Sequence, residues 1–470
     1  MRFIIILLLF FSINIIAQDS LSYSYFDKKT YNLYLKQDWA KLIKVSKQAF
    51  KKGYDSYYFH MRIGIAYYEK KRYVKATKHF EKARKYNINP TLKEYLYYSY
   101  LYSGYTFKAE YYSQFLTDTL KKKIGIKYRF LNSADLFGGS FINNNFDKLN
   151  DKEFHNNTKY VSSSTRFKNK LNNTYGLGIG INFSTHIKAY INYSFLSENK
   201  TQITKTNISS SEYETETYDT KTTQSSYYFN IKYLSNSFSL TSALNILNIT
   251  DNYMYPYIDY GLFYQNNNTS NSDFIFGINL QQKISNFEIG LRGAFSNLND
   301  NRQLLAELEA IYYPLGNKNL YLIVSTGFQN IAEKITTTSG RRNREKTSYS
   351  TIENNNISKI KFGFKTFKYL WIETQVYFGR INEYNEANSF VVYNDISPIT
   401  SQYRLNLISP ITKHLSIFVK YSYNTREQYY YNFKIVPAVY PEPPGPVLET
   451  ETDYNKINNS SIIGGIKWTF

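Results

Sequence analysis

The sequence predicts an α+β protein with two parts, N-terminal α-helical hairpins followed by an antiparallel transmembrane β-barrel of about 14 strands, with about 12 or 16 as the alternatives. Apolar residues recur at helical spacing up to residue 123, and with a period of two from residue 124 onward. In the second part very short turns alternate with long polar loops, and the chain ends in an alternating strand. We therefore divide the chain into residues 1–17, 18–123 and 124–470.

Residues 1–17 predict a secretory signal peptide. Arg2 supplies the positive start, an apolar run extends to about residue 16, and Ala17 is a small residue at which a peptidase could cut. The apolar run is shorter than the ~20 residues that a spanning helix needs. The chain contains no cysteine, which excludes disulfides, thiolate metal sites and a lipid-modified cysteine.

Residues 18–123 show an internal repeat, because Trp39, Tyr73 and Phe107 follow one another at the period of a helix-turn-helix unit. The middle copy reads "HMRIGIAYYEKKRYVKATKHFEKARKYNINP" and resembles a tetratricopeptide repeat. The matching small and aromatic residues are Gly64, Tyr67, Ala76, Phe80 and Ala83. The resemblance implies that paired helices approach closely at the small residues and that aromatic rings fill the space between hairpins.

The helical part is strongly basic, with 22 Lys and Arg against 9 Asp and Glu, a net charge of +13 within a chain of +20. Such a surface could bind a periplasmic protein, phospholipid headgroups or an anionic polymer. The alternative is a solvated lysine-rich surface without a partner. Nucleic acid is not expected, because a signal peptide directs the protein away from it.

The second part has the pattern of an outer-membrane barrel of a Gram-negative bacterium. Short turns are expected at 184–186, 235–237 and 284–286, and long polar loops at 197–225, 331–356 and 424–456. A sheet that spans a membrane must close, because an open edge leaves backbone groups unpaired in hydrocarbon. The last strand should therefore pair with the first, which we expect at 124–132.

The C-terminal strand carries apolar side chains on one face, including Ile466, Trp468 and Phe470. A terminal strand with a final Phe resembles the assembly signal of outer-membrane barrels. The resemblance implies recognition by the barrel insertion machinery and contact with outer-membrane lipid.

The sequence gives no indication of an enzyme or a cofactor site. It has five His, and none is placed with partners suited to metal binding or nucleophilic catalysis. The strand pattern instead directs charged side chains into the lumen, namely Glu288, Arg292, Glu307, Glu309, Lys361, Glu373, Arg404, Lys420 and Lys467. Acidic and basic residues could face each other across an open constriction, or they could pair and close the barrel.

The whole arrangement is similar to exopolysaccharide-export porins and to YaiO-type barrels, which combine helical repeats with an outer-membrane barrel. The resemblance implies transport or export through the outer membrane, with a surface polysaccharide as a candidate cargo and the tetratricopeptide-like domain as a docking module in the periplasm. A non-conducting structural or assembly factor anchored by its barrel is the alternative. An outer-membrane barrel enzyme is the third hypothesis.

Overall fold

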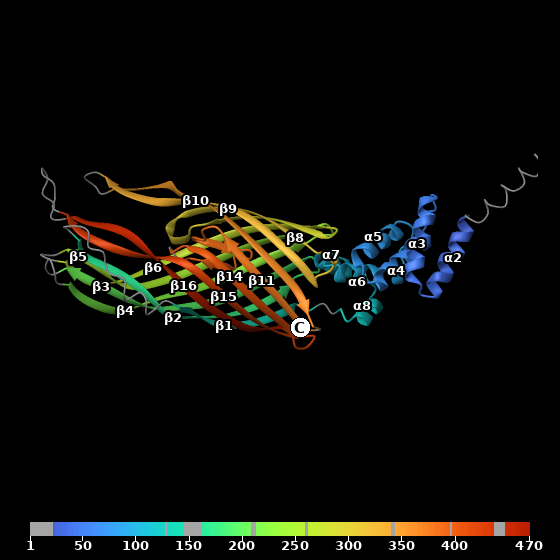
Figure 1. The fold of residues 1–470 in the computed structure, drawn as a ribbon, viewed down its shortest axis with the longest axis horizontal. Coiled ribbons are helices and arrows are strands. Elements are labelled where there is room, and N and C mark those ends of the chain that lie inside the picture. The colour runs from blue at the N-terminus through green and yellow to red at the C-terminus, as the bar shows by residue number, and fades with distance from the viewer. Residues whose placement is uncertain are drawn as a thin grey trace, which may run out of the picture.

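The computed structural model describes residues 22–470, except 127–128, 145–160, 208–212, 259–261, 340–343, 368, 395–396 and 437–446. The predicted signal peptide at 1–17 lies outside the described residues. The described chain forms a row of helices followed by a closed barrel, in the order that the sequence predicts (Figure 1).

Within the described residues, seven helices form the first part, which we call the helical domain. They are α2 (Tyr23–Leu35), α3 (Trp39–Lys51), α4 (Tyr57–Glu69), α5 (Tyr73–Arg84), α6 (Pro90–Tyr102), α7 (Thr106–Ser113) and α8 (Asp118–Ile124). Polar N-caps start several of them: Asp38 accepts from the amide of Lys41 at 3.1 Å, and Asn89, followed by Pro90, accepts from Leu92 at 2.8 Å. None of the helices in the described ranges combines the length and apolar character needed to cross a membrane.

The five residues of the middle repeat all lie in the core of the helical domain, where their side chains are almost fully buried. Gly64 of α4 faces the ring of Phe80 on α5, and a Cβ atom at position 64 would come within 2.5 Å of that ring. The small residue therefore allows α4 and α5 to pack closely, and Phe80 fills the contact.

Two histidines, the buried His60 and the half-buried His79, meet between helices α4 and α5. His60 Nδ1 lies 3.1 Å from His79 Nδ1, and the His79 ring stacks on Phe50 and Tyr67. Burial, together with the neighbouring His60 and lysines, lowers the pKa of His79 from 6.5 to about 3. The neutral imidazole is therefore the form that the folded helical domain holds.

Acid should destabilise the helical domain through His79. Its folded pKa is depressed, so below pH 6.5 the unfolded chain takes up a proton that the folded chain does not, and stability falls as the pH falls toward 3. At pH 5 the loss should be about 2 kcal/mol relative to pH 8. Thermal melts of the helical circular-dichroism signal at both pH values should show this loss, and His79→Phe should reduce it. An equally steep loss in His79→Phe would contradict the assignment.

Fourteen antiparallel strands close the barrel, in the order β1-β16-β15-β14-β11-β10-β9-β8-β7-β6-β5-β4-β3-β2, and the predicted strand number is confirmed. Two further short strands, β12 (Tyr384–Glu386) and β13 (Val391–Tyr393), form a separate two-stranded sheet. The barrel strands are β1 (Leu131–Asn143), β2 (Val161–Asn182), β3 (Ile187–Asn207), β4 (Tyr213–Leu234), β5 (Phe238–Ile258), β6 (Leu262–Ile284), β7 (Phe287–Ser296), β8 (Arg302–Tyr312), β9 (Leu320–Ser339), β10 (Arg344–Thr366), β11 (Leu370–Phe378), β14 (Ile399–Pro410), β15 (Leu415–Val436) and β16 (Val447–Thr469).

The first strand begins later than predicted. Residues up to Ile124 belong to helix α8, Gly125 ends that helix with a φ of 78°, and β1 starts at Leu131. Two of the apolar residues that suggest a strand at 124–132, Ile124 and Ile126, instead pack against the core of the helical domain.

The segments expected to be long loops are mostly strand. β3 and β4 pair along their length from Ile187↔Tyr233 to Asn207↔Tyr213, and β9 and β10 pair as far as Ser339↔Arg344. Thr, Ser and Asn alternate in these segments, so the backbone can extend the ladder far beyond the ~10 residues that cross a bilayer. The polar segments expected to be loops are therefore the ends of long strands, and they lie beyond the apolar belt of the barrel.

The barrel closes between its first and last strands, as expected. β1 and β16 pair from Ser133↔Thr469 to Asn143↔Asn459, and the Phe470 amide donates to the Asn132 carbonyl at 3.0 Å. Ile466, Trp468 and Phe470 are exposed on the outside of the barrel, where His414 stacks on Trp468. The terminal aromatic residues therefore lie at the end of the barrel that carries the short turns.

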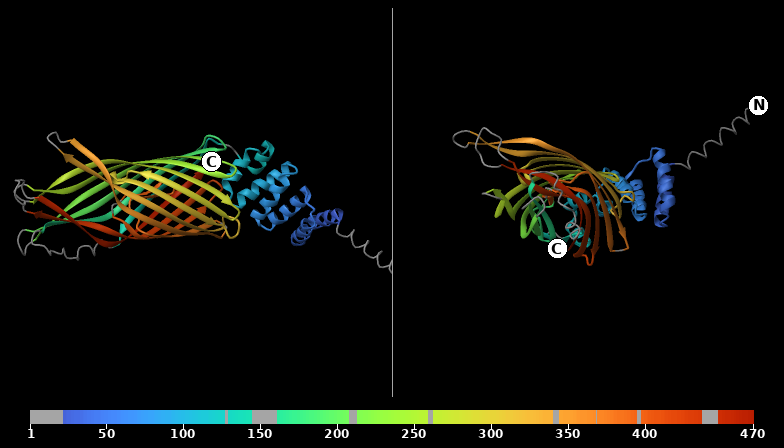
Figure 2. Two further views of the ribbon diagram at one scale, coloured as in Figure 1. Left: turned by 90° about the horizontal axis from the view of Figure 1, so that it is seen from above. Right: turned by 60° about the vertical axis from the view of Figure 1, so that its left-hand side comes forward.

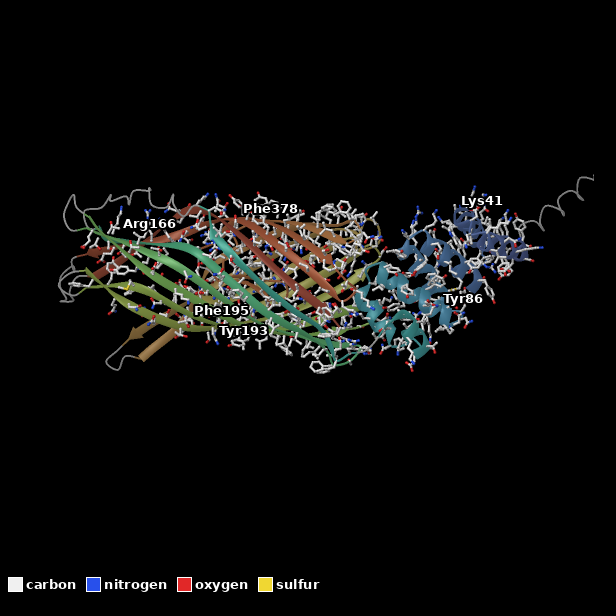
Figure 3. All side chains as sticks on the ribbon, turned by 90° about the horizontal axis from the view of Figure 1, so that it is seen from below. Lys41, Tyr86, Arg166, Tyr193, Phe195 and Phe378 are labelled. Atoms are coloured by element: carbon white, nitrogen blue, oxygen red, sulfur yellow. The ribbon has the colours of Figure 1, made fainter. Side chains whose placement is uncertain are left out.

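The outer surface of the barrel is a belt of exposed apolar side chains. Tyr193 and Phe378 show this orientation in Figure 3. Other members include Leu177, Ile191, Leu244, Phe276, Leu291, Leu308, Val324, Phe362 and Val419. An apolar surface of this extent on every side of a closed sheet is the surface that a bilayer covers.

The helical domain contacts the short-turn end of the barrel and extends away from it (Figure 2). Glu110 of α7 pairs with Lys188 at 2.8 Å, and Gln114 Nε2 lies 3.0 Å from His186 Nε2. The Lys283 ammonium lies over the rings of Tyr313 and of Tyr105, the residue that precedes α7. Ionic and aromatic contacts therefore fix α7 at the mouth of the barrel.

Candidate functional site

A loop folded inside the barrel is the main feature of the lumen. It connects β11 to β14 and contains β12 and β13, and we call its residues 379–394 the plug loop. Gly379 starts it with a φ of 101°, and a Cβ atom there would collide with the backbone carbonyl of Asn356. Ala387, Asn388 and Ser389 have φ values of 51°, 58° and 68°, which form the tight reversal between β12 and β13.

Hydrogen bonds from the barrel wall hold the tip of the plug loop. Asn245 Nδ2 donates to the Ser389 carbonyl at 2.9 Å, and Tyr228 Oη donates to the Asn388 carbonyl at 3.0 Å. Asn279 Nδ2 donates to Asn388 Oδ1 at 2.7 Å. These donors come from β4, β5 and β6, and they satisfy carbonyl groups that would otherwise be buried without a partner.

An aromatic contact joins the plug loop to the far wall. Phe390 packs against Tyr228, with ring centroids 5.1 Å apart, and against Tyr190 and Phe137 at 6.2 and 6.4 Å. These rings belong to β4, β3 and β1. The plug loop therefore starts between β11 and β14 and extends across the lumen to strands on the other side.

Ion pairs surround the base of the plug loop. Glu307 Oε2 accepts from Arg292 Nη2 at 2.7 Å, and Glu307 Oε1 lies 2.5 Å from the Lys359 ammonium. Arg292 Nη2 also donates to the Asn385 carbonyl at 2.7 Å. The Arg292 and Glu307 side chains are only 7% and 5% exposed, so this network is removed from solvent.

Glu386 of β12 forms a second ionic contact with the wall. It pairs with Arg404 and accepts a hydrogen bond from Tyr377, and Tyr393 Oη donates to it at 3.1 Å. Glu383 accepts from Gln303 Nε2 at 2.7 Å and from Asn299 Nδ2 at 2.8 Å. The carboxylate of Glu386 in β12 and that of Glu383, the residue before β12, therefore both contact polar groups of the barrel.

The predicted lumen charges lie on the inner wall, but they are not divided into two facing arcs. Arg292 pairs with Glu307 on the neighbouring strand, Lys361 lies 3.7 Å from Glu373, and Arg404 pairs with the plug loop. Glu288 accepts from Tyr313 at 3.0 Å. The remaining three, Glu309, Lys420 and Lys467, line cavities.

Sequence reasoning missed half of this network. The residues that complete it are Lys359, Tyr377, Glu383, Tyr384 and Glu386, and the last three lie in the plug loop. The signal that could have found the loop is "INEYNEANSFVVYN", which has two short alternating segments around a polar turn but lacks the length of a spanning strand.

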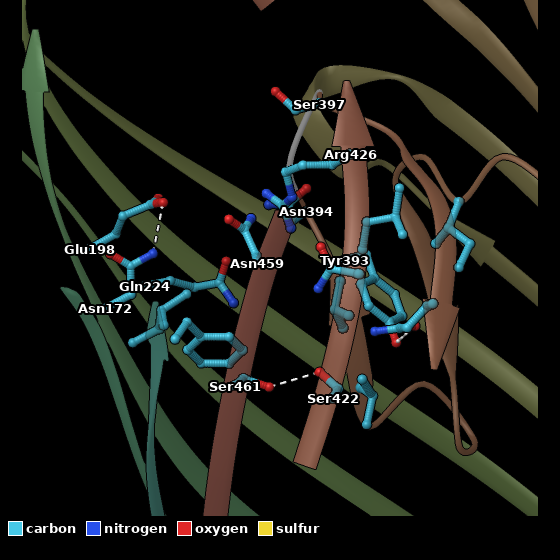
Figure 4. Close-up of a pocket in the computed structure, with 18 of the residues that line it drawn as sticks. Asn172, Glu198, Gln224, Tyr393, Asn394, Ser397, Ser422, Arg426, Asn459 and Ser461 are labelled. Atoms are coloured by element: carbon cyan, nitrogen blue, oxygen red, sulfur yellow. Dashed lines mark hydrogen bonds between the residues drawn. The ribbon is translucent and has the colours of Figure 1, made fainter. Parts of the chain in front are cut away.

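A cavity of about 1050 Å³ occupies much of the lumen beside the plug loop, and Ala387, Val391 and Tyr393 of that loop line it. Figure 4 shows part of its lining, where Asn172 donates to Glu198 at 2.9 Å and Ser422 and Ser461 lie 2.8 Å apart. Amide and hydroxyl groups dominate this view, and Phe167, Tyr253 and Tyr429 add aromatic surface. Such a lining suits small polar or amphiphilic solutes.

A smaller cavity of about 350 Å³ lies at the short-turn end of the barrel, where Tyr190 separates it from Phe390 of the plug loop. Its lining includes Lys188, Lys232 and Lys467. In the described part of the chain, no group of three His, Cys, Asp or Glu is placed to hold a metal ion.

No family model matches the chain, and no curated protein matches it in sequence. Solved structures similar to it include a FadL homologue of Pseudomonas aeruginosa, with a TM-score of 0.40, 9% identity, and coverage of 72% of this chain and 90% of that one. The toluene transporter TodX of Pseudomonas putida has a TM-score of 0.40 and 6% identity, with coverage of 72% of this chain and 90% of that one. The toluene transporter TbuX of Ralstonia pickettii has a TM-score of 0.41 and 7% identity, with coverage of 72% of this chain and 90% of that one. These likenesses concern the fold alone.

Proposed function

We propose that this protein is an outer-membrane transport barrel of a Gram-negative bacterium in which the plug loop controls passage. The observation that supports it most strongly is the loop that crosses the lumen beside the larger cavity and ends in an aromatic contact. The contacts that hold it are hydrogen bonds, ion pairs and ring packing. Water and solute can replace such contacts, so the loop can move without breaking a covalent bond.

The solute that fits best is small and polar or amphiphilic. The larger cavity offers amides, hydroxyls and aromatic rings together with charged side chains such as Lys361 and Lys420, and such groups fix the orientation of a polar solute. A continuous surface polysaccharide would require the plug loop to leave the lumen completely. We therefore favour a small solute over a polymer, and conduction over catalysis.

The helical domain lies on the periplasmic side in this proposal, since it contacts the short-turn end of the barrel. Its basic surface, which includes the exposed Lys41 in Figure 3, offers a docking site for a periplasmic protein or an anionic polymer. A tetratricopeptide-like role in docking would use the outer faces of helices α2 to α6. The C-terminal strand would serve the insertion machinery.

The second candidate function is a non-conducting anchor or assembly factor, and the paired charges around the plug loop favour it. Arg292, Glu307 and Lys359 form a network that would close a structural barrel as well as a gated one. The two functions differ in whether solute can pass at all.

Shortening the plug loop should separate the two functions. Replacing residues 380–397 with a short Gly-Ser turn should give a large rise in planar-bilayer conductance and in liposome-swelling rates, because the lumen would lose its crossing segment. A matched control shortens the outer ends of β9 and β10 by a similar number of residues and should conduct like the wild type. If the wild type and the shortened barrel are both silent, the transport function is rejected.

A further inference from the structure

The smaller cavity is lined by lysines that project inward from three strands. Lys188 of β3, Lys232 of β4 and Lys467 of β16 line it, and Asp135 of β1 is its carboxylate. The neighbouring residues on these strands, such as Ile187, Tyr233 and Trp468, are exposed on the outside of the barrel. Since side chains alternate along a strand, the three lysines point into the lumen.

The carboxylates around this cavity are already engaged. Glu110 of α7 pairs with Lys188 at 2.8 Å. Asp135 is the cross-strand partner of Lys467, but its Oδ1 accepts the Tyr190 hydroxyl at 2.7 Å. Within the described residues, neither Lys232 nor Lys467 has a carboxylate oxygen within the 4.0 Å of an ion pair.

Charged groups of both signs surround Lys232 at a greater distance. The charged groups that act on it are Glu110, Glu288, Lys188 and Lys318, two of each sign. Neither carboxylate forms an ion pair with Lys232, and Glu110 pairs with Lys188 instead. Two cations that face one cavity without partners attract an anion, because the surrounding protein screens charge less than water does.

We propose that this cavity binds the anionic group, a phosphate or a carboxylate, of a small solute at the periplasmic end of the lumen. Lys232 and Lys467 are its cationic ligands, and Lys188 is held in place by Glu110. The volume of about 350 Å³ accommodates a small anionic solute but not a long polymer segment. This site deepens the proposed transport function by giving the charge of the solute, but anion binding itself can be measured without transport.

The position of the cavity relates it to the plug loop. Tyr190 lines the cavity, and its ring contacts Phe390 at the end of the loop. The other side of the cavity is lined by Gly180 and Lys188, and Lys188 pairs with Glu110 of α7 at the rim of the barrel. An anion held here would therefore lie between the plug loop and the helical domain.

Titration calorimetry on the full-length protein in detergent tests the proposal, with inorganic phosphate and succinate as separate probes at low ionic strength. Lys232→Gln or Lys467→Gln should each weaken binding by about tenfold, because each removes one charge-assisted hydrogen bond. The double variant should bind neither probe. Lys413→Gln, an exposed lysine of the same rim outside the cavity, is the matched control and should bind like the wild type.

The two probes identify the anionic group, since binding of only one assigns the site to phosphates or to carboxylates. Gel heat-modifiability should confirm that each variant is folded. The proposal is overturned if the wild type binds neither probe, or if folded Lys232→Gln and Lys467→Gln bind as tightly as Lys413→Gln. If the protein binds the anion but never conducts, the transport function is rejected and the anion-binding site is supported. If it conducts but binds no anion, the anion-binding site is rejected and the transport function is supported.

Discussion

Oxidation of a Gly277→Cys, Ser389→Cys double variant is expected to abolish passage through the lumen, and reduction is expected to restore it. A Cβ atom at Gly277 of β6 would lie 3.7 Å from the Cβ of Ser389 in the plug loop. Disulfides have Cβ atoms about 3.5–4.5 Å apart, so this pair can form one without moving the backbone. The chain has no cysteine of its own, so no other disulfide competes.

The expected effect is large because the bond fixes the reversal of the loop to the wall. Hydrogen bonds from Asn245 and Tyr228 already hold the neighbouring carbonyls, and the loop can move only if these are exchanged for water. A covalent link at the same place removes that exchange. Planar-bilayer conductance and solute uptake into liposomes, each measured before and after reductant, provide the readout.

A second disulfide controls for the chemistry of oxidation. Ser422 and Ser461 are cross-strand partners on β15 and β16, and their hydroxyls lie 2.8 Å apart inside the lumen. Their double cysteine variant links two strands of the wall and leaves the plug loop free, so its conductance should not respond to reductant. If the oxidised Gly277→Cys, Ser389→Cys barrel conducts as well as the reduced one, the plug loop is not the gate.

The sequence was sufficient for the division into helices and barrel and for the number of strands. The period of the apolar pattern changes once, near residue 123, and side-chain alternation is a local property that survives folding. The inward direction of residues such as Arg292 and Glu307 follows from the same alternation. The closure between the first and last strands follows from the need to satisfy backbone groups in a membrane.

The sequence was insufficient where the structure depends on the length of a strand or on the strand it pairs with, because the period of the apolar pattern does not report either. Polar alternation at 197–225 has the composition of a loop, but a neighbouring strand makes it part of a ladder. β12 and β13 have three residues each, too few for a periodic signal, and their place inside the lumen depends on side chains of four other strands. The pairing of Lys359 with Glu307 depends on register across β8, β9 and β10, which alternation alone does not fix.

Glu307→Gln is expected to destabilise the folded barrel strongly. Glu307 accepts from Arg292 Nε at 3.0 Å and from Arg292 Nη2 at 2.7 Å, and it lies 2.5 Å from the Lys359 ammonium. A neutral amide would leave two cations close together in a site from which solvent is largely excluded. Removing one partner of a buried ion pair costs about 3–5 kcal/mol. Urea unfolding in detergent, followed by tryptophan fluorescence and gel heat-modifiability, should show a lower midpoint.

Glu309→Gln separates this effect from a general loss of negative charge. Glu309 lies two residues further along β8, faces the larger cavity, and has no ion pair among the described residues. The same substitution there should leave the unfolding midpoint near that of the wild type. In a conducting barrel it should shift ion selectivity toward anions, because it removes a negative charge from the wall of the cavity. Equal stability of the two variants would contradict the view that Arg292, Glu307 and Lys359 act as one buried network. That result would imply that water reaches these side chains and that the base of the plug loop is already open.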